Sequence, residues 1–371
     1  MAIIKPPLTQ IPNTICSVDD YRVLAKQHLS ADTLAWLNGG AADEFSLDDN
    51  RAAFQRLRLN SRVLQAMHGG NTQLNLFGQP FDYPIFLAPI AHHHLVHEQG
   101  ESASLLAASA MNAGMVISTQ AGVSLEQLAE EAHAPLWFQL YLQPDRAFTE
   151  QLVKRAESAG YQALVLSVDA PISGLRNREQ RSGFVMPESL SAVNLTGMQQ
   201  LPPYQAQAGQ SPLFNSPLLA HAATWQTIQW LKNRTHLPII IKGIMHPSDA
   251  QLAIDYGADG IIVSNHGGRV LDGVPASIDA LPAIANVVGS RIPILLDGGI
   301  RRGSDIIKAL ALGAQAVLIG RPYLHALACA GAPGVAHVLH LLRSELELAM
   351  IHTGCRSLAD IQPSIIWHNG H

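Results

Sequence analysis

Short apolar runs alternate with amphipathic segments over most of the chain after about residue 80. A short run rich in branched residues predicts a buried strand, and apolar residues three or four positions apart predict a helix. The eight runs are residues 84–90, 114–118, 136–141, 163–169, 238–242, 260–265, 293–297 and 316–320. Helices are predicted between them, for example over residues 147–159, 222–234, 247–256 and 304–312.

Eight strand–helix units predict a parallel sheet closed into a (β/α)8 TIM barrel. Each crossover returns right-handed, and eight is a common number of strands at which such a sheet closes. An open, doubly wound sheet is the structural alternative. That fold is typically marked by Gly-x-Gly-x-x-Gly after the first strand, and no such sequence follows the first run here.

Shorter segments flank the predicted barrel. Residues 1–80 begin with a proline-containing arm and continue with helices that start at Ser17 and cover residues 31–38 and 48–57, so they predict an N-terminal helical cap. The barrel is assigned to residues 81–353 and ends in a closing helix over residues 335–351. Residues 354–371 are assigned to a C-terminal tail.

One connection is much longer than the others. About fifty residues separate Asp169 from Ala222, with several prolines and few apolar runs. Because it follows the fourth strand, this insertion lies on the face where barrel enzymes carry their active sites. We expect a lid over residues 177–220, with a family-specific decoration or an oligomer contact as the alternative.

Composition narrows the function classes. The chain has 371 residues, is 47% hydrophobic and 14% charged, and carries a net charge of −5, so it can bury a large core and offers no basic surface for nucleic acid. Three widely separated cysteines favour a reducing compartment. No continuous apolar segment long enough for a signal or a membrane span is expected, which predicts a soluble, cytoplasmic protein without membrane partners.

Every predicted barrel strand ends in residues that can form hydrogen bonds. If the barrel is right, these ends share one rim and form the active site. They are Ala88-Pro89-Ile90-Ala91-His92, Ser118-Thr119-Gln120, Gln139-Leu140-Tyr141, Ser167-Val168-Asp169, Lys242-Gly243, Ser264-Asn265-His266, Asp297-Gly298-Gly299 and Gly320-Arg321.

The sixth strand carries the residues best suited to acid–base chemistry on an anion. After Ser264 come His266 and Arg269, separated by two glycines that allow a close approach of backbone and ligand. An imidazole can act as a general base near neutral pH, and a guanidinium can bind a carboxylate through two parallel hydrogen bonds. A solvated surface loop is the alternative for this motif alone.

Glycines and arginines follow the seventh and eighth strands, where many barrels bind phosphate. Asp297, Gly299 and Arg301 belong to the first group, and Gly320 and Arg321 to the second. Glycine permits close contact between the backbone and a phosphate, and arginine matches its oxygens. This spacing predicts a phosphoryl group without identifying its carrier.

Ser264-Asn265-His266-Gly267-Gly268-Arg269, together with these segments, resembles the FMN-dependent 2-hydroxy acid oxidases and dehydrogenases, which include glycolate oxidase, lactate oxidase and mandelate dehydrogenase. The resemblance runs from about residue 17 to about residue 353. It implies FMN as cofactor, no metal, and a homotetramer. The residues that it assigns to FMN are Pro89, Ile90, Ala91, Ser118, Gln139, Ser167, Lys242, Ser264, Asp297, Gly299, Arg301, Gly320 and Arg321.

The same resemblance assigns the substrate site. It makes His266 the catalytic base, paired with Asp169, and Arg269 the residue that binds the substrate carboxylate. Arg176, just before the predicted lid, matches a second, mobile arginine, and Tyr141 matches a phenol that contacts the substrate. A carboxylate beside the histidine would orient the imidazole and stabilise its cation.

Two positions depart from the family pattern. Trp36 stands where the family usually has tyrosine, and Gln120-Ala121-Gly122 follows the second strand where glycolate oxidase-like members carry tryptophan. Indole keeps one N–H donor but is larger than phenol and cannot accept a hydrogen bond. The resemblance therefore implies a reshaped substrate pocket, with Trp36 counted among the substrate-binding residues.

A histidine cluster offers a competing interpretation. His92, His93, His94 and His97 could bind a transition metal, since clustered imidazoles do so in many proteins, but the family uses none and no metal is expected.

The sequence thus predicts FMN-dependent oxidation of an L-2-hydroxy acid to the 2-oxo acid, with O2 as acceptor and H2O2 as product. A dehydrogenase that passes electrons to a quinone or another carrier is the alternative, followed by a flavin-binding isomerase and a catalytically silent subunit. The choice of acid, the fate of the α-hydrogen as proton or hydride, and the position of the lid are left open by the sequence.

Overall fold

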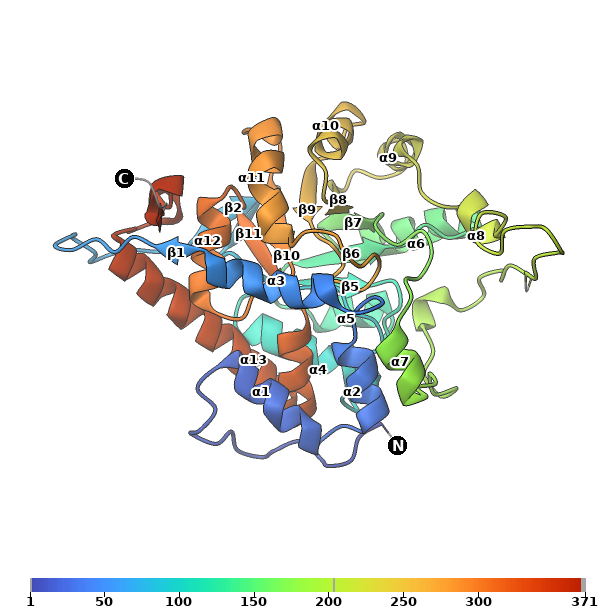
Figure 1. Cartoon of the computed structure of the whole chain (residues 1–371), viewed down its shortest axis with the longest axis horizontal. Helices are drawn as coiled ribbons and strands as arrows, with labels where there is room; N and C mark the ends of the chain where they lie inside the picture. The colour runs from blue at the N-terminus through green and yellow to red at the C-terminus, as the bar shows by residue number, and fades with distance from the viewer. Residues whose placement is uncertain (1, 203, 368–371) are drawn as a thin grey trace.

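The eight predicted strands form a closed parallel barrel in the computed structural model, which describes residues 2–202 and 204–367 (Figure 1). The prediction of a (β/α)8 barrel is therefore confirmed. Around the barrel the strands follow the order β10-β11-β4-β5-β6-β7-β8-β9. Their bounds are β4 Ile85–Leu87, β5 Gly114–Ser118, β6 Leu136–Leu140, β7 Ala163–Ser167, β8 Ile239–Ile244, β9 Gly260–Val263, β10 Ile294–Asp297 and β11 Ala316–Ile319.

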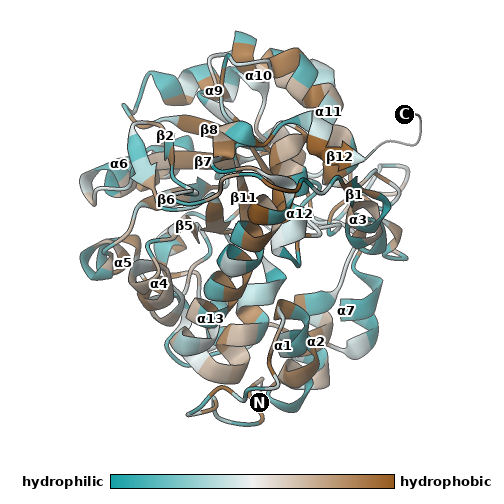
Figure 2. Cartoon of the chain, turned by 90° about the vertical axis from the view of Figure 1, so that its left-hand side faces the viewer, coloured by the Kyte–Doolittle hydropathy of each residue, from teal (hydrophilic) through white to brown (hydrophobic). Residues whose placement is uncertain are grey.

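The strands read as continuous apolar runs because both of their faces are buried. In β4, Phe86 belongs to the cluster that fills the barrel interior, while Ile85 and Leu87 belong to the larger core between strands and helices. The same alternation places Ile240 of β8 inside and Ile239 and Ile241 outside. In Figure 2 the strands β7, β8 and β11 accordingly appear brown, whereas teal residues are concentrated on the outer helices.

Helices surround the barrel and cover its outer face (Figure 1). Several are capped by the residues that precede them; Asp145, for example, accepts hydrogen bonds from the backbone N–H groups of Ala147 and Phe148. The outer helices are α4 Gly100–Ala110, α5 Leu125–Glu131, α6 Arg146–Ser158, α9 Trp225–Lys232, α10 Pro247–Asp255, α11 Ser277–Val288, α12 Gly303–Ala311 and α13 Arg321–Thr353.

The closing helix is longer than the sequence indicated. We predicted residues 335–351, but α13 begins at Arg321, directly after β11. Two helical segments meet at Ala330 and Gly331, where the backbone is not helical and Gly331 has a φ of 59°.

Helix α13 is also long and apolar enough to cross a membrane, although no such segment was expected from the sequence. In the most apolar 18-residue stretch of this helix, 67% is buried inside the protein, so we interpret α13 as a core helix.

A short antiparallel hairpin contacts the barrel interior, and the sequence analysis did not predict it. It consists of β2 Leu74–Leu76 and β3 Gln79–Phe81. Its aromatic residues pack against the interior cluster: the ring centroids of Phe81 and Phe86 lie 4.7 Å apart, and those of Phe77 and Trp137 lie 5.6 Å apart. The hairpin thus covers the end of the barrel at which Phe86 and Trp137 lie.

The N-terminal cap contains the three predicted helices, α1 Val18–Leu24, α2 Ala31–Asn38 and α3 Phe45–Arg56. Helix α3 begins three residues before the predicted start at residue 48. Its first turn is capped from a distant segment, because the Asp272 carboxylate accepts hydrogen bonds from the N–H groups of Phe45 and Ser46. Near the end of the chain, β12 Ile366–Trp367 pairs with β1 Arg58–Leu59 beside the cap.

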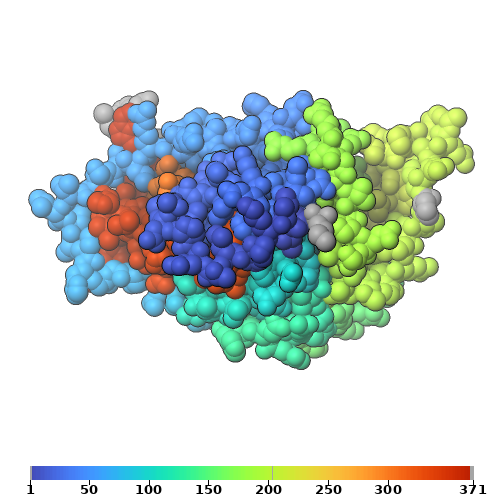
Figure 3. Space-filling view, turned by 90° about the horizontal axis from the view of Figure 1, so that it is seen from below, coloured from blue at the N-terminus to red at the C-terminus, as the bar shows by residue number. Residues whose placement is uncertain are grey.

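The insertion after β7 contains α7 Asn177–Ser182, a 3₁₀ turn at Val193–Leu195 and α8 Pro217–Ala220. Helix α7 packs against α2 of the N-terminal cap. Figure 3 shows the same neighbourhood, with the blue N-terminal segments beside the light green insertion. The predicted lid is therefore joined to the cap.

We expect Phe81→Ala to lower the free energy of unfolding by about 3–5 kcal/mol, because it removes a ring that is only 4% exposed and touches two other aromatic residues. Urea unfolding measures the change. Leu106→Ala is the control: Leu106 is 62% exposed, and its loss should cost less than about 0.5 kcal/mol. Equal stability of the two variants would contradict the role assigned to the hairpin.

Candidate active site

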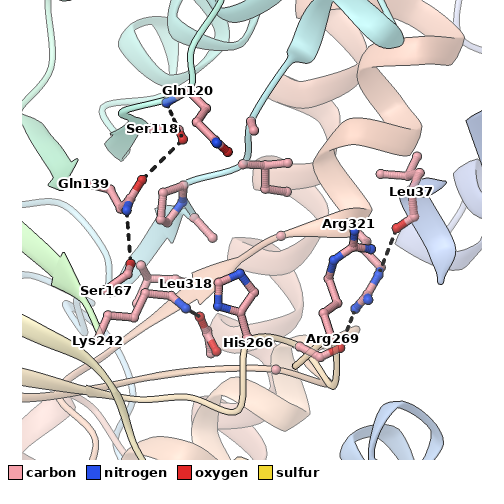
Figure 4. Close-up of a pocket in the computed structure, with 18 of the residues that line it drawn as sticks. Leu37, Ser118, Gln120, Gln139, Ser167, Lys242, His266, Arg269, Leu318 and Arg321 are labelled. Atoms are coloured by element: carbon pink, nitrogen blue, oxygen red, sulfur yellow. Dashed lines mark hydrogen bonds and ion pairs between the residues drawn. The ribbon is translucent and has the colours of Figure 1, made fainter. Parts of the chain in front are cut away.

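A cavity of about 400 Å³ lies at the C-terminal ends of the barrel strands, between the barrel and the segments that contain α2 and α7 (Figure 4). Its wall contains all the predicted site residues except Asp169 and Ser264. Those two lie directly behind the wall, where they contact His266 and Lys242 respectively. The predicted residues that line the cavity are Trp36, Pro89, Ile90, Ala91, Ser118, Gln139, Tyr141, Ser167, Arg176, Lys242, His266, Arg269, Asp297, Gly299, Arg301, Gly320 and Arg321.

His266 and Asp169 form a hydrogen-bonded pair. The Nδ1 atom of His266 lies 2.9 Å from Oδ1 of Asp169, so Nδ1 carries the proton and Nε2 is the free nitrogen. Burial alone would raise the pKa of Asp169, but the charge of Lys242 and the hydrogen bond from His266 lower it below its ordinary value. Asp169 is therefore ionised at neutral pH and fixes the orientation of an imidazole that can accept a proton.

Lys242 is a buried cation between two carboxylates. Its Nζ lies 3.2 Å from Asp297 and 3.9 Å from Asp169, and it donates a hydrogen bond of 2.9 Å to Ser264. Burial alone would lower its pKa, but the two carboxylates raise it above the ordinary value. Lys242 thus keeps its charge although its side chain is only 5% exposed.

Ser118, Gln139 and Ser167 connect the ends of three neighbouring strands through side-chain hydrogen bonds (Figure 4). Ser118 donates to the Gln139 carbonyl over 3.3 Å, and the Gln139 amide donates to Ser167 over 3.2 Å. The backbone N–H of Thr119, which can only donate, lies 3.2 Å from the same Gln139 oxygen and so fixes which end of the amide faces each neighbour. The result is a polar wall with defined donors and acceptors.

Arg269 and Arg321 both contact the C-terminal end of α2. Arg269 donates to the carbonyls of Trp36 and Gly39 over 2.8 and 2.9 Å, and Arg321 donates to those of Leu37 and Gly39 over 3.1 and 2.9 Å. The last carbonyls of a helix lack partners within the helix and carry partial negative charge, which favours cations. Sequence reasoning missed these contacts, although the predicted helix end at Gly39 marked where such carbonyls would lie.

The protein offsets only part of the free-energy cost of burying the charges of Arg301 and Arg321. Burial and the charge of Arg51 lower the pKa of Arg301 to about 10. Burial and the charges of Arg269 and Arg301 lower the pKa of Arg321 well below its ordinary value. A dianion between these guanidinium groups would offset both the burial and the mutual repulsion. The arrangement therefore suits a phosphate monoester.

Neighbouring groups fit the rest of such a ligand. Gly320 precedes the N-terminus of α13, and a Cβ placed there would meet only Ile90, at 3.7 Å, so a ligand has room beside the helix N–H groups. The Oδ1 atom of Asp297 is buried and has no partner among the described residues, so it can accept a hydrogen bond from a hydroxyl group. Together with the polar wall, these features fit FMN.

Trp36 and Tyr141 supply aromatic surface to the cavity. The Trp36 ring stacks on Phe184 of the insertion, with centroids 6.0 Å apart, and the Arg269 guanidinium lies 5.8 Å from its centre. Burial raises the pKa of Tyr141, so its phenol keeps its proton at neutral pH and can donate a hydrogen bond. Arg176 and Glu179 line the cavity beside these rings.

Sequence reasoning did not assign several lining residues, including Leu37, Ser173, Glu179 and Met186. Each lies outside the strand ends, where a pattern search had no reason to look. The cavity wall also contains Gln120, one of the positions that depart from the family pattern.

The four clustered histidines do not act together. His92 lines the cavity, whereas His93 is buried and contacts Ser104 and Tyr323, each over 3.1 Å. His94 lies 3.6 Å from the Glu101 carboxylate, and His97 packs beside a glycine of α13. Within residues 2–202 and 204–367, no group of three or more His, Cys, Asp or Glu side chains is placed to hold a metal ion.

Comparison with known proteins identifies the family. The sequence profile of the FMN-dependent dehydrogenases matches residues 25–368. An L-lactate oxidase from Nostoc sp. is 47% identical over 94% of this chain and 96% of its own, and a 2-hydroxyacid oxidase from Dictyostelium discoideum is 43% identical over 96% and 91%.

A solved structure with the same fold is a mandelate oxidase with benzoyl-formic acid. It is 38% identical, covers 94% of this chain and 97% of its own, and gives a TM-score of 0.85. Three observations point to the same family: the barrel fold, the cavity that fits FMN, and the family profile that matches nearly the whole chain. The chain is an oxidoreductase that uses FMN and belongs to the FMN-dependent dehydrogenase family.

Proposed function

We propose that the protein oxidises an L-2-hydroxy acid to the 2-oxo acid and passes the electrons to O2, giving H2O2. The main support for this proposal is that one cavity contains both a base, His266 paired with Asp169, and a group that can bind a carboxylate, the Arg269 guanidinium. A base and a carboxylate-binding group side by side suit a substrate that carries a hydroxyl next to a carboxylate. The relatives named as oxidases favour O2 over a quinone or another carrier.

The protein binds the acid through complementary charge and hydrogen bonds. Arg269 and Arg176 bind its carboxylate, and the protonated Tyr141 donates to an oxygen of the substrate. Burial and the charge of Arg176 lower the pKa of Arg269 to about 10, so a bound carboxylate relieves an unfavourable arrangement of charge. This binding orients the hydroxyl toward His266.

His266 accepts a proton through Nε2 as the substrate is oxidised. Asp169 holds the opposite nitrogen and stabilises the imidazolium that results. Bound FMN would supply the acceptor for the two electrons that leave the substrate, which would then pass to O2. The residues assigned to its phosphate are Arg301, Arg321 and Gly320, and Lys242 supplies a fixed positive charge in the same cavity. An isomerase or a silent subunit would not require the His266–Asp169 pair.

The same proposal includes a cytoplasmic homotetramer, which rests on the resemblance and on the composition. Light scattering of the purified protein measures the oligomeric state: a mass four times that of the chain supports the tetramer, and the mass of a monomer contradicts it.

His266→Ala should retain FMN yet lose flavin reduction by the acid by several orders of magnitude, because the base is removed and the phosphate site is untouched. Stopped-flow absorbance under nitrogen measures the reduction. His236→Ala, which removes an exposed histidine, is the control and should behave as the unchanged protein. Rapid reduction in the His266 variant would exclude this residue as the base.

Two neighbouring arginines should separate cofactor binding from substrate binding. Arg321→Met should weaken FMN binding by about 10- to 100-fold, which is the expected loss of a charged hydrogen bond. Arg269→Met should keep FMN but raise the KM for the acid to a similar extent. Each variant loses a contact to the Gly39 carbonyl and so controls for the other. Equilibrium dialysis gives the dissociation constant of FMN, and steady-state kinetics give the KM for the acid. If both variants changed these two constants in the same way, the separate assignment of Arg321 to the cofactor and Arg269 to the substrate would be wrong.

Trp36→Tyr should raise the turnover of glycolate or lactate relative to larger or aromatic acids. The change restores a hydroxyl and reduces the apolar surface beside Arg269. One hydrogen bond in such a site changes preference by about tenfold or more. The ratio of kcat/KM for the two classes of acid measures the effect, and an unchanged ratio would show that Trp36 does not contact the substrate.

A further inference from the structure

Glu179 brings a carboxylate to the two arginines assigned to the substrate. Its Oε2 atom lies 3.5 Å from Nη1 of Arg176 and 3.9 Å from Nη2 of Arg269, and its side chain lines the cavity. About a quarter of the Glu179 side chain is exposed, so the three groups interact in a partly water-excluded space. Glu179 has no role in the proposed binding of the acid or in the proton transfer to His266.

The helix that carries Glu179 is held in place from the N-terminal cap. Arg178 forms an ion pair with Glu44, and the other oxygen of Glu44 accepts a hydrogen bond of 2.9 Å from the N–H of Gly40. Just after α7, Phe184 stacks on Trp36. Glu179 is therefore positioned from both sides: the residue before it is joined to Glu44, in the segment between α2 and α3, and Phe184 after it is joined to Trp36 of α2.

The charges at this end of the cavity set how many carboxylates can bind there. Arg176 and Arg269 carry two positive charges, and Glu179 carries one negative charge, which leaves a net charge of about +1 for the three groups at neutral pH. One substrate carboxylate brings the sum to zero. A second carboxylate would meet the negative charge of Glu179 with no further positive charge among these three groups to balance it.

We propose that Glu179 is a specificity-determining residue that limits the site to 2-hydroxy acids with a single carboxylate. The inference rests on the proposed function, since it takes Arg176 and Arg269 as the groups that bind the substrate carboxylate. Glu179 acts through charge rather than shape: it offsets one arginine and makes a dianion a poorer ligand than a monoanion. It also holds Arg176 toward the cavity, which is a positioning role.

Oxamate and oxalate form a suitable pair of probes. They are similar in size and shape, but oxamate carries one negative charge and oxalate carries two at neutral pH. Calorimetry on the FMN-loaded protein gives a dissociation constant for each probe without requiring turnover. The ratio of the two constants isolates the effect of the additional charge.

Glu179→Gln should shift this ratio toward oxalate by about tenfold or more, because the repulsive charge is gone while the size of the side chain is kept. Glu179→Asp keeps the charge on a shorter side chain, and its ratio should stay within about threefold of the unchanged protein. FMN content confirms that both variants are folded.

An unchanged ratio in Glu179→Gln would overturn the proposal, and so would an equal gain in affinity for both probes, which would mean that Glu179 merely competes with any carboxylate. Failure of both probes to bind the unchanged protein would also overturn it. Failure of the proposed function has a different signature: no 2-hydroxy acid would reduce the flavin, whatever the ratio for the two probes.

Discussion

Lys242, Arg269, Arg301 and Arg321 place four positive charges at one end of the barrel, on side chains that are largely buried. Burying a charge costs free energy unless a partner of opposite charge or several hydrogen bonds compensate it. Carboxylates compensate Lys242, and the carbonyls at the end of α2 compensate part of the cost for Arg269 and Arg321. The part of this cost that the protein does not offset favours the binding of anions. The site is suited to two of them, a phosphate and a substrate carboxylate.

This constraint connects parts of the chain that are far apart in sequence. The arginines come from strand ends in the second half of the chain, whereas the carbonyls belong to α2 in the N-terminal cap. Helix α7 of the insertion packs on the same helix, and the ion pair between Arg178 and Glu44 joins it to the segment that follows α2. The cap is thus part of the site, because it orients the arginines and holds the segment that carries Arg176 and Glu179.

The sequence predicted the barrel because its signal is local: each strand is a short apolar run, and each run ends in polar residues. Closure of the barrel then brings residues as distant as Ser118 and Arg321 to one rim, so the lining of the cavity could be predicted from the order of strands. The resemblance to a known family added the roles of residues outside the strands, such as Arg176.

Features that depend on contacts between distant segments escaped prediction. Helix α3 starts early because Asp272 caps it from more than 200 residues away, and no local pattern records that contact. The hairpin over residues 74–81 has strands too short to show a period, and its position depends on packing against Trp137. No local pattern marks Glu179, because its place beside two arginines arises only when the insertion folds against the barrel.

The proposed oxidation of an L-2-hydroxy acid is tested most directly by anaerobic titration of the FMN-loaded protein with the L and D forms of lactate and mandelate, followed by admission of O2. At least one L acid should bleach the oxidised flavin while its D form does not. Oxygen should then restore the spectrum with about one H2O2 formed per flavin. A flavin spectrum that none of these acids, nor glycolate, changes would contradict the central claim.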